Sequence, residues 1–256
     1  MDLLQVTIKL YQRSDKMSLT NKTPESQVES LFNELAPNYD SMNSLISLGL
    51  HRKWRRIAMK ELHHLRGAFV IDVCCGTGDW TVALAKAVGP AGRVVGLDFS
   101  EDMLAVAKKK IAAAGVSDRV TLVSGDAMEL PYADDEFDVA TIGFGLRNVP
   151  DANRVLAEMV RVVHPNGQIE SLETSKPTSP LLKLGWWGYF KIVPVMAQFA
   201  VGKYREYSYL QQTAKQFVTA KQLAQMFRKA GMTNVSYRLL TFGAAALHLG
   251  RAEKSE

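Results

Sequence analysis

The stretch from residue 69 to residue 85, FVIDVCCGTGDWTVALA, most constrains what this chain can fold into. It opens with an apolar run that is typical of a fully buried strand, and Asp72 lies near the end of that run. Gly76 and Gly78 then flank Thr77, and helical character resumes directly after them. A strand, a glycine turn and a helix in this order predict the start of a nucleotide-binding βαβ unit, in which a ligand approaches backbone that carries no Cβ atom.

A second acidic residue narrows the class of ligand. The next short strand, RVVGL, ends in Asp98, about 20 residues past the glycines, where a carboxylate accepts hydrogen bonds from ribose hydroxyls. The full dinucleotide fingerprint needs a third glycine at the position of Thr81, so a dehydrogenase that uses NAD is disfavoured. Asp72, an anion at the edge of a buried strand, requires a cationic or hydrogen-bonding partner. These features favour another adenosine-containing ligand over the alternative, a tight turn that binds nothing.

Strands and helices alternate along most of the chain, which predicts an α/β fold with a doubly wound parallel sheet. Helices are expected before the first strand and between the others. The predicted strands lie at residues 69–71, 93–97, 120–123, 137–142, 168–172, 235–240 and 244–249.

Composition limits the classes of protein without choosing one. A chain of 256 residues with 47% apolar residues can form one large globular domain with a small appendage. The net charge of +5 suits an anionic membrane surface or nucleic acid. The two cysteines, Cys74 and Cys75, are adjacent, which fits a reducing compartment better than a structural disulfide. No cluster has zinc-ligand spacing, so no metal is expected.

We expect two parts in the chain: an extension at residues 1–26 that is mobile, and one domain at residues 27–256. Residues 1–16 lack both a signal-peptide pattern and a globular pattern. Residues 181–202 are rich in large apolar side chains, but two lysines and a proline interrupt them, so a transmembrane helix is rejected. We expect residues 181–215 to form a helical cover over the substrate. The basic face of the helix near residues 50–62 is either solvated or faces lipid headgroups.

Together these motifs resemble class I methyltransferases that use S-adenosylmethionine, and more narrowly the C-methyltransferases of menaquinone and ubiquinone biosynthesis. The paired cysteines resemble the menaquinone members from Gram-positive bacteria. The resemblance implies a Rossmann-like, seven-stranded, mostly parallel sheet with an antiparallel last strand, N-terminal helices and a helical insertion after strand 5. The matching segments span residue 27 to the end and are NYD with MNS, DVCCGTGDW, GLDFSEDML, GDAMELPY, FDVATIGFGLRNV, LETSKP, YSYLQQ and ALH.

The resemblance also implies roles for single residues. For catalysis it leads us to expect His248 as the base, Arg147 as the cation that faces a phenolate, and Tyr39 or Asn148 as orienting groups. His248 could instead be a structural histidine of the last strand, and Arg147 could pair with a structural carboxylate. The residues expected to line or shape the S-adenosylmethionine site are Asp72, Gly76, Thr77, Gly78, Asp98, Asp126 and Ala127.

The implied reaction is methyl transfer from S-adenosylmethionine to a ring carbon of demethylmenaquinol, which gives menaquinol. The expected partners are a prenylated naphthoquinol, the membrane surface and a second copy of the chain, without nucleic acid; the expected location is the cytoplasm, at the inner face of the cell membrane. The alternatives are methylation of a polyprenyl benzoquinol, or of another small molecule or RNA. A nucleic-acid methyltransferase should carry a base-flipping motif such as Asn-Pro-Pro-Tyr or a catalytic cysteine outside the cofactor loop.

Overall fold

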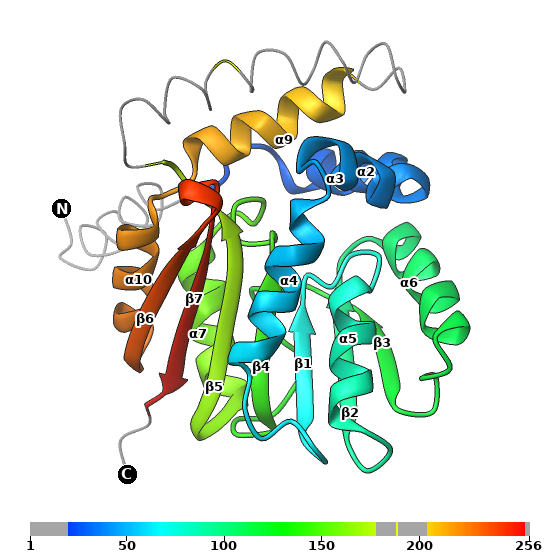
Figure 1. The fold of residues 1–256 in the computed structure, drawn as a ribbon, viewed down its shortest axis with the longest axis vertical. Helices are drawn as coiled ribbons and strands as arrows, with labels where there is room; N and C mark the ends of the chain where they lie inside the picture. The colour runs from blue at the N-terminus through cyan, green and yellow to red at the C-terminus, as the bar shows by residue number, and fades with distance from the viewer. Residues whose placement is uncertain (1–19, 178–187, 189–203, 254–256) are drawn as a thin grey trace, which may run out of the picture.

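The computed structural model describes residues 20–177, 188 and 204–253. Within them the chain forms a seven-stranded sheet in the order β3-β2-β1-β4-β5-β7-β6 (Figure 1). Strands β1 to β5 are parallel, and β7 runs antiparallel to both β5 and β6, which confirms the predicted fold class. The strands are β1 (Phe69–Val73), β2 (Arg93–Asp98), β3 (Val120–Ser124), β4 (Phe137–Gly143), β5 (Val163–Thr174), β6 (Met232–Leu240) and β7 (Ala245–Ala252).

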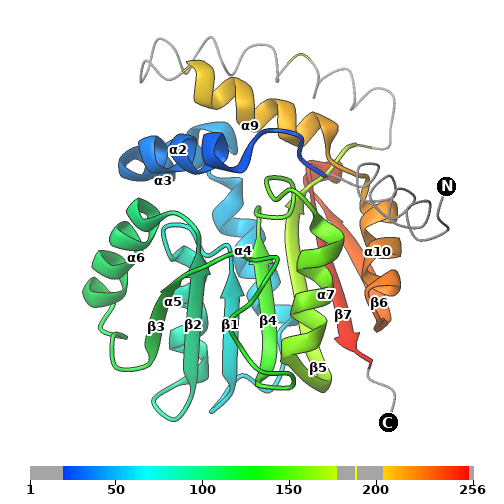
Figure 2. The same cartoon turned by 180° about the vertical axis from the view of Figure 1, so that it is seen from behind.

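Helices cover both faces of the sheet. One face carries α4 (Leu50–Glu61), α5 (Asp79–Val88) and α6 (Glu101–Ala113), and the other carries α7 (Ala152–Val162) and α10 (Ala220–Lys229) (Figures 1 and 2). The sequence determines where several helices begin, because side chains accept hydrogen bonds from their first free N–H groups. Asp151 caps α7, and Thr219 caps α10 in a capping box.

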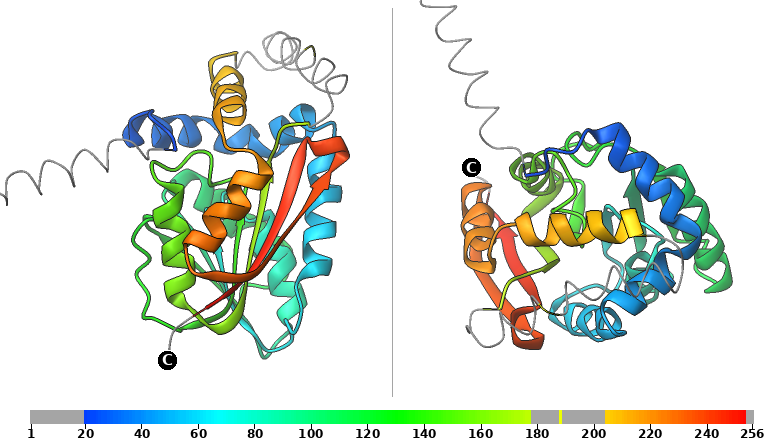
Figure 3. Two further views of the ribbon diagram at one scale, coloured as in Figure 1. Left: turned by 90° about the vertical axis from the view of Figure 1, so that its left-hand side faces the viewer. Right: turned by 90° about the horizontal axis from the view of Figure 1, so that it is seen from above.

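A third group of helices lies across the carboxyl ends of the strands. It consists of α2 (Glu25–Leu35), the 3-10 turn η1 (Ala36–Asn38), α3 (Tyr39–Ile46) and α9 (Tyr204–Gln216) (Figure 3). These helices share an apolar cluster of their own, which also includes one residue of α6. The carboxyl edge of a parallel sheet is where ligands bind in such folds, so this group forms the roof of the candidate site.

The predicted extension at residues 1–26 needs a correction where the structure describes it. The backbone N–H of Thr20 donates to the carbonyl of Pro150 over 2.7 Å. Asn21 is buried, and its amide donates to the Asn148 carbonyl and the Tyr209 hydroxyl, both at 2.9 Å. Residues 20–26 are therefore attached to the domain, although their polar sequence carries no periodic apolar signal. Residues 1–19 lie outside the described residues.

None of the helices in the described part of the chain is long and apolar enough to span a bilayer. The predicted cover at residues 181–215 is described only at residue 188 and in α9. The segment that contains Trp186 and Trp187 lies outside the described residues, so its predicted role stays a prediction.

Candidate active site

Three hollows adjoin one another at the carboxyl edge of the sheet. The first, which we call the β2 pocket, has a volume of about 720 Å³ and lies beside the ends of β1, β2 and β3. Its lining includes four of the predicted binding residues: Gly76, Asp98, Asp126 and Ala127. Helix α2 closes the pocket from above with Val28 and Phe32.

Asp98 is held rigidly at the end of β2. Its carboxylate accepts hydrogen bonds from the backbone N–H groups of Gly76, at 2.8 Å, and Ser100, at 3.0 Å. Burial raises the pKa of Asp98 to about 6, against the lowering effect of those backbone donors. A ligand that donates hydrogen bonds to Asp98 would favour the ionised form of its carboxyl group.

Asp126 is exposed at the rim of the β2 pocket, and one of its oxygens caps the following turn by accepting from the N–H of Met128 at 2.8 Å.

The two glycines of the turn have different tasks. Gly76 has a φ of +55° and lines the β2 pocket. Gly78 has a φ of +77° and precedes α5; a Cβ atom there would lie 2.9 Å from the Cβ of Ala107 in α6. Gly76 therefore shapes the ligand site, while Gly78 allows two helices to approach each other.

The second hollow, the β1 pocket, has a volume of about 450 Å³ and lies over the end of β1. Asp72 lines it from below and is buried. The hydroxyls of Thr81 and Thr141 donate to its two oxygens over 2.7 and 2.9 Å. Burial nevertheless raises the pKa of Asp72 to about 6. The β1 pocket thus contains a carboxylate that two neutral donors satisfy and that a cationic group would stabilise further.

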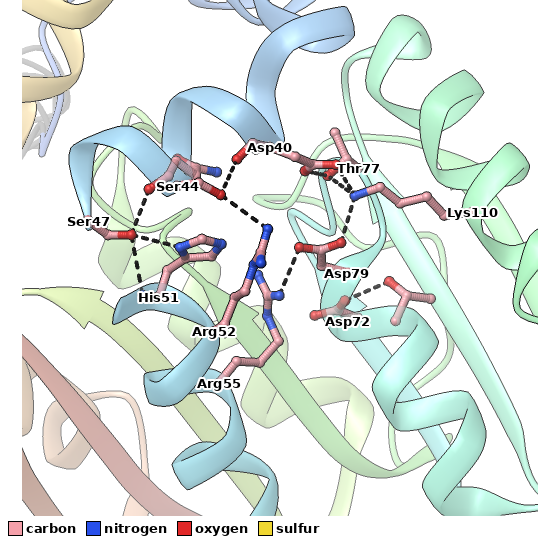
Figure 4. A network of polar contacts seen from close by, with 12 residues as sticks. Asp40, Ser44, Ser47, His51, Arg52, Arg55, Asp72, Thr77, Asp79 and Lys110 are labelled. Atoms are coloured by element: carbon pink, nitrogen blue, oxygen red, sulfur yellow. Dashed lines mark hydrogen bonds and ion pairs between the residues drawn. The ribbon is translucent and has the colours of Figure 1, made fainter. Parts of the chain in front are cut away.

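A cluster of charges, which we call the clamp, closes the outer side of the β1 pocket (Figure 4). Lys110 of α6 pairs with Asp40 of α3 and, over 2.6 Å, with Asp79 of α5. Arg55 of α4 pairs with the other oxygen of Asp79 over 2.8 Å. Burial opposes the ionisation of Asp79, but Arg55 and Lys110 outweigh it and lower its pKa. The clamp thereby ties four helices around the glycine turn.

Thr77, predicted to line the cofactor site, lies in the β1 pocket, but its hydroxyl is already engaged by the clamp. It donates to Asp40 over 2.7 Å and accepts from Lys110 over 3.0 Å. Sequence reasoning missed Lys110 because it stands in a run of three lysines that is typical of a solvated helix face.

The third hollow, the α4 pocket, has a volume of about 1120 Å³ and lies between α3, α4, α9 and the ends of β4 and β5. Its wall is mainly apolar, with Trp54 and Phe144 as the large aromatic groups and Leu210 contributed by α9. Phe144 lines all three hollows. The α4 and β1 pockets also share Asn43 and Arg55. A molecule in the apolar pocket would therefore adjoin one held at the glycine turn.

Arg147, the predicted cation, lines the α4 pocket and is buried. Its Nη1 donates to the Glu173 carboxylate over 2.6 Å and to the Phe144 carbonyl over 2.7 Å. Its Nε is buried without a partner within the described residues. Arg147 therefore pairs with a structural carboxylate, as one of the two sequence interpretations has it, and its Nε–H keeps the capacity to donate to a ligand; its role as the cation that faces a phenolate stays a prediction.

Tyr39, the predicted orienting residue, lies between the β2 and β1 pockets. Its ring faces the glycine turn, since its Cε1 lies 3.9 Å from where a Cβ atom of Gly76 would be. Burial raises the pKa of its hydroxyl, so the group is protonated and can donate at neutral pH. Asn148, the second predicted orienting residue, lines the β2 pocket with a buried Oδ1 that has no partner in the described part of the chain.

The structure does not bring His248, the predicted base, to the site. His248 lies in β7 beneath α10, stacked on Tyr237 and next to Phe227. Its Nε2 hydrogen-bonds the carbonyl of Ala220 over 2.8 Å, and burial lowers its pKa to about 4. His248 is absent from the described linings of all three hollows. The position of His248 fits the alternative interpretation, that of a structural histidine. We therefore do not retain His248 as the base.

Gly143, at the end of β4, is constrained by packing. A Cβ atom there would lie 2.7 Å from Cε3 of Trp80, whose ring is buried. The indole N–H of Trp80 in turn points at the sulfur of Met59, 3.1 Å away. Trp80 therefore occupies the space that a side chain at position 143 would need.

Comparison with known proteins agrees with this geometry. The model of the ubiE/COQ5 methyltransferase family matches residues 20–252. Demethylmenaquinone methyltransferase of Lactobacillus johnsonii is 50% identical over 239 residues, 93% of this chain and 98% of the relative. The protein of that name from Halalkalibacterium halodurans is 49% identical over 233 residues, 91% of this chain and 95% of the relative.

Solved structures share the fold at low sequence identity. A possible histamine N-methyltransferase from Thermotoga maritima superimposes with a TM-score of 0.63 at 18% identity, covering 88% of this chain and 100% of its own. A SAM-dependent methyltransferase from Aquifex aeolicus gives a TM-score of 0.57 at 18% identity, and the match covers 77% of this chain and 89% of that protein. At this identity the likeness concerns the arrangement of the sheet and its helices.

Proposed function

The chain belongs to the ubiE/COQ5 methyltransferase family, and from that premise we propose that it transfers a methyl group from S-adenosylmethionine to a ring carbon of demethylmenaquinol, giving menaquinol. The observation that carries this proposal is the apolar α4 pocket, which adjoins the glycine-turn pockets through Phe144 and is lined by Arg147, whose Nε–H has no partner among the described residues. A prenylated naphthoquinol offers apolar surface for the walls and a ring oxygen for that donor.

The residues at the glycine turn suit S-adenosylmethionine, which supplies an electrophilic methyl group on a sulfonium when bound. Asp98 would accept hydrogen bonds from the ribose hydroxyls, and Asp126 from the adenine amino group. Asp72, in the β1 pocket, would stabilise the positively charged end of the ligand, which explains why a buried carboxylate is tolerated there. Gly76 provides the close approach of backbone.

The residues of the α4 pocket position the quinol and exclude water. Trp54 and Phe144 would pack against the ring, and each Å² of apolar surface they cover contributes ~25 cal/mol. The Nε–H of Arg147 would donate to a ring oxygen and stabilise the negative charge that develops there as the carbon becomes nucleophilic. The hydroxyl of Tyr39, at the junction of the pockets, would help to orient the reacting groups.

The test of the function is a direct assay of the full-length protein with S-adenosylmethionine and quinols reduced by dithionite. We expect mass spectrometry to show a gain of one methyl group on a prenylated demethylmenaquinol, and much slower reaction with a prenylated benzoquinol. A protein that binds S-adenosylmethionine but methylates the benzoquinol preferentially would move the assignment to the ubiquinone branch. Methylation of neither quinol would contradict the proposal.

We propose further that the protein acts at the membrane surface, because two exposed apolar side chains flank the α4 pocket. Leu48, in the α3–α4 turn, is 70% exposed, and Phe242, in the η2 turn (Thr241–Gly243), is 76% exposed. The indole N–H of Trp54 in α4 donates to the Thr241 hydroxyl over 2.8 Å and links α4 to the η2 turn. The α4 pocket includes Leu48 and Ala244, so both turns lie at its mouth. Exposed basic residues of α4, Arg52, Lys53 and Arg56, would favour anionic lipid.

The double variant Leu48→Asp/Phe242→Asp is expected to lose vesicle binding. Each aspartate removes an apolar side chain whose burial is worth ~1.5–3 kcal/mol, so the partition onto vesicles of anionic phospholipid should fall by at least ~10-fold. Co-sedimentation with such vesicles measures it. The exposed Lys108→Asp on α6 is the matched control, since it changes the net charge by the same two units. Equal losses of vesicle binding in both variants would mean that charge alone attracts the protein.

Sedimentation velocity would check the predicted homodimer.

A further inference from the structure

His51 is a buried histidine that the sequence analysis did not single out. It lies in the first turn of α4, is 5% exposed and lines the α4 pocket together with Phe144 and Arg147. Among the described residues of this lining, the other ionisable side chains are Arg55 and Arg147. A guanidinium stays protonated in proteins. His51 is therefore the one group in the described wall of the α4 pocket that can accept a proton near neutral pH.

The hydrogen bonds around Ser47 favour one tautomer of His51. The Ser47 hydroxyl has a single hydrogen, and it donates to the carbonyl of Asn43, 2.6 Å away. The same oxygen lies 2.7 Å from His51 Nδ1, and with the hydroxyl hydrogen directed at Asn43 it accepts from Nδ1–H. The neutral ring consequently keeps its lone pair on Nε2. Nε2 points away from Ser47 and has no hydrogen-bond partner in the part of the chain described here (Figure 4).

The charges around His51 keep the ring neutral. Burial is the largest effect and lowers its pKa, and the positive charges of Arg55 and Arg52 on the same helix lower it further. Asp79 of α5 and Asp40 of α3 oppose this without reversing it. A histidine that must accept a proton has to be unprotonated beforehand, so this environment suits a base at pH 7.

We propose that His51 accepts the phenolic proton of the quinol through Nε2, and that Ser47 is the positioning residue that holds the ring. The inference rests on the proposed function and adds the group that activates the substrate. Arg147 would stabilise the oxygen that loses the proton. His51 thus replaces His248, which the structure places beneath α10.

The phenolic O–H bond breaks, its proton bonds to Nε2, and the electron pair is delocalised to the ring carbon that bonds to the methyl group. The bond between that methyl group and sulfur breaks with its pair going to sulfur. The methylated carbon then loses its hydrogen to water, and the proton on Nε2 returns to the oxygen. One proton is released to solvent, and neutral His51 is restored.

The test is His51→Asn, because the asparagine amide can still donate to Ser47 but cannot take up a proton. We expect kcat to fall by ~10²–10⁴, while the affinity for S-adenosylmethionine measured by calorimetry and the melting temperature change little. Free imidazole should restore part of the rate. His63→Asn, an exposed histidine outside the three hollows, is the matched control and should keep wild-type kcat. Ser47→Ala should lower kcat by less than His51→Asn does, and Ser47→Thr should restore it.

The pH profile separates this role from a structural one. With both substrates saturating, wild-type kcat should fall as the pH drops through the pKa of His51, which burial and the neighbouring arginines lower from its ordinary value. Asp72 and Asp98 also titrate near pH 6, but they act on S-adenosylmethionine binding and would appear in its KM. In His51→Asn the acid limb of kcat should disappear, and the rate should rise steadily with pH as the quinol ionises unaided.

Two results would overturn the assignment: a His51→Asn enzyme with more than a third of wild-type kcat, or an acid limb that survives the substitution. If the wild-type protein methylates demethylmenaquinol, either result would contradict the role of His51 and leave the proposed function intact. Failure of the wild type itself to methylate that quinol would instead contradict the function.

Discussion

Replacing Asp98 by asparagine is expected to weaken S-adenosylmethionine binding by ~1.5–3 kcal/mol, or roughly 10- to 150-fold in Kd. The carboxylate already accepts from two backbone N–H groups, which hold it at the end of β2 for the ribose hydroxyls. Asparagine keeps the shape but loses the charge that strengthens such bonds. Titration calorimetry at pH 7.5 measures the change. An unchanged Kd in a folded variant would remove Asp98 from the site.

The raised pKa of Asp98 adds a pH dependence with a definite sign. Because the folded protein holds this proton more tightly than the unfolded chain does, stability without ligand should fall as the pH rises from about 4 towards 6. Asp98→Asn lacks this group, so its melting temperature relative to wild type should rise over the same interval. S-adenosylmethionine favours the ionised carboxylate, and its affinity for wild type should therefore increase with pH through about 6. A difference in melting temperature that does not vary with pH would contradict the linkage.

The parts of the site that follow from one local pattern could be predicted from the sequence. The strand and glycine turn around Gly76, and the acidic residue that ends β2, depend on short segments whose geometry is nearly fixed. The structure places Gly76, Asp98, Asp126 and Ala127 in one pocket. Hydrogen bonds between distant segments were not predictable in this way. The hydroxyl of Thr77, for example, bonds to Asp40 and Lys110, which lie 37 and 33 positions away in the sequence.

His248 and His51 show most clearly which parts of the site could not be predicted from the sequence. Strand alternation predicts that His248 shares a face with Ala246 and Gly250, but it does not say which of the two faces of the sheet that is. The docking of α10 decides this, and α10 covers His248. His51 stands beside arginines and lysines in a helix whose basic face the sequence assigns to solvent or to lipid headgroups. The structure buries His51 because α4 turns the side of the helix that carries this residue towards the α4 pocket. The distant helix α9 contributes Leu210 and Ala214 to the wall of that pocket.

The second large effect is expected at the buried ion pair of Arg147 and Glu173. Both side chains are at most 8% exposed, and their charged atoms lie 2.6 Å apart. Arg147→Met leaves a buried carboxylate without its cation, which typically costs ~3–5 kcal/mol of stability. It also removes the Nε–H proposed to face the quinol oxygen, so kcat should fall by ~10²–10³. Arg119→Met, which breaks the exposed pair with Asp118, is the matched control and should hardly alter the melting temperature.

A second substitution separates the structural effect of Arg147 from the catalytic one. In Arg147→Met/Glu173→Gln the uncompensated charge is gone, and the glutamine oxygen can still accept from the N–H of Thr174, as the Glu173 carboxylate does over 2.6 Å. Stability should therefore recover in part, measured as the free energy of unfolding in urea, because a neutral buried amide is far less costly than an unpaired carboxylate. Activity should stay low, since no donor faces the quinol oxygen. A double variant that regained both stability and kcat would show that Arg147 only neutralises Glu173, and that the oxygen of the quinol is stabilised by another group, with the Tyr39 hydroxyl as the next to test.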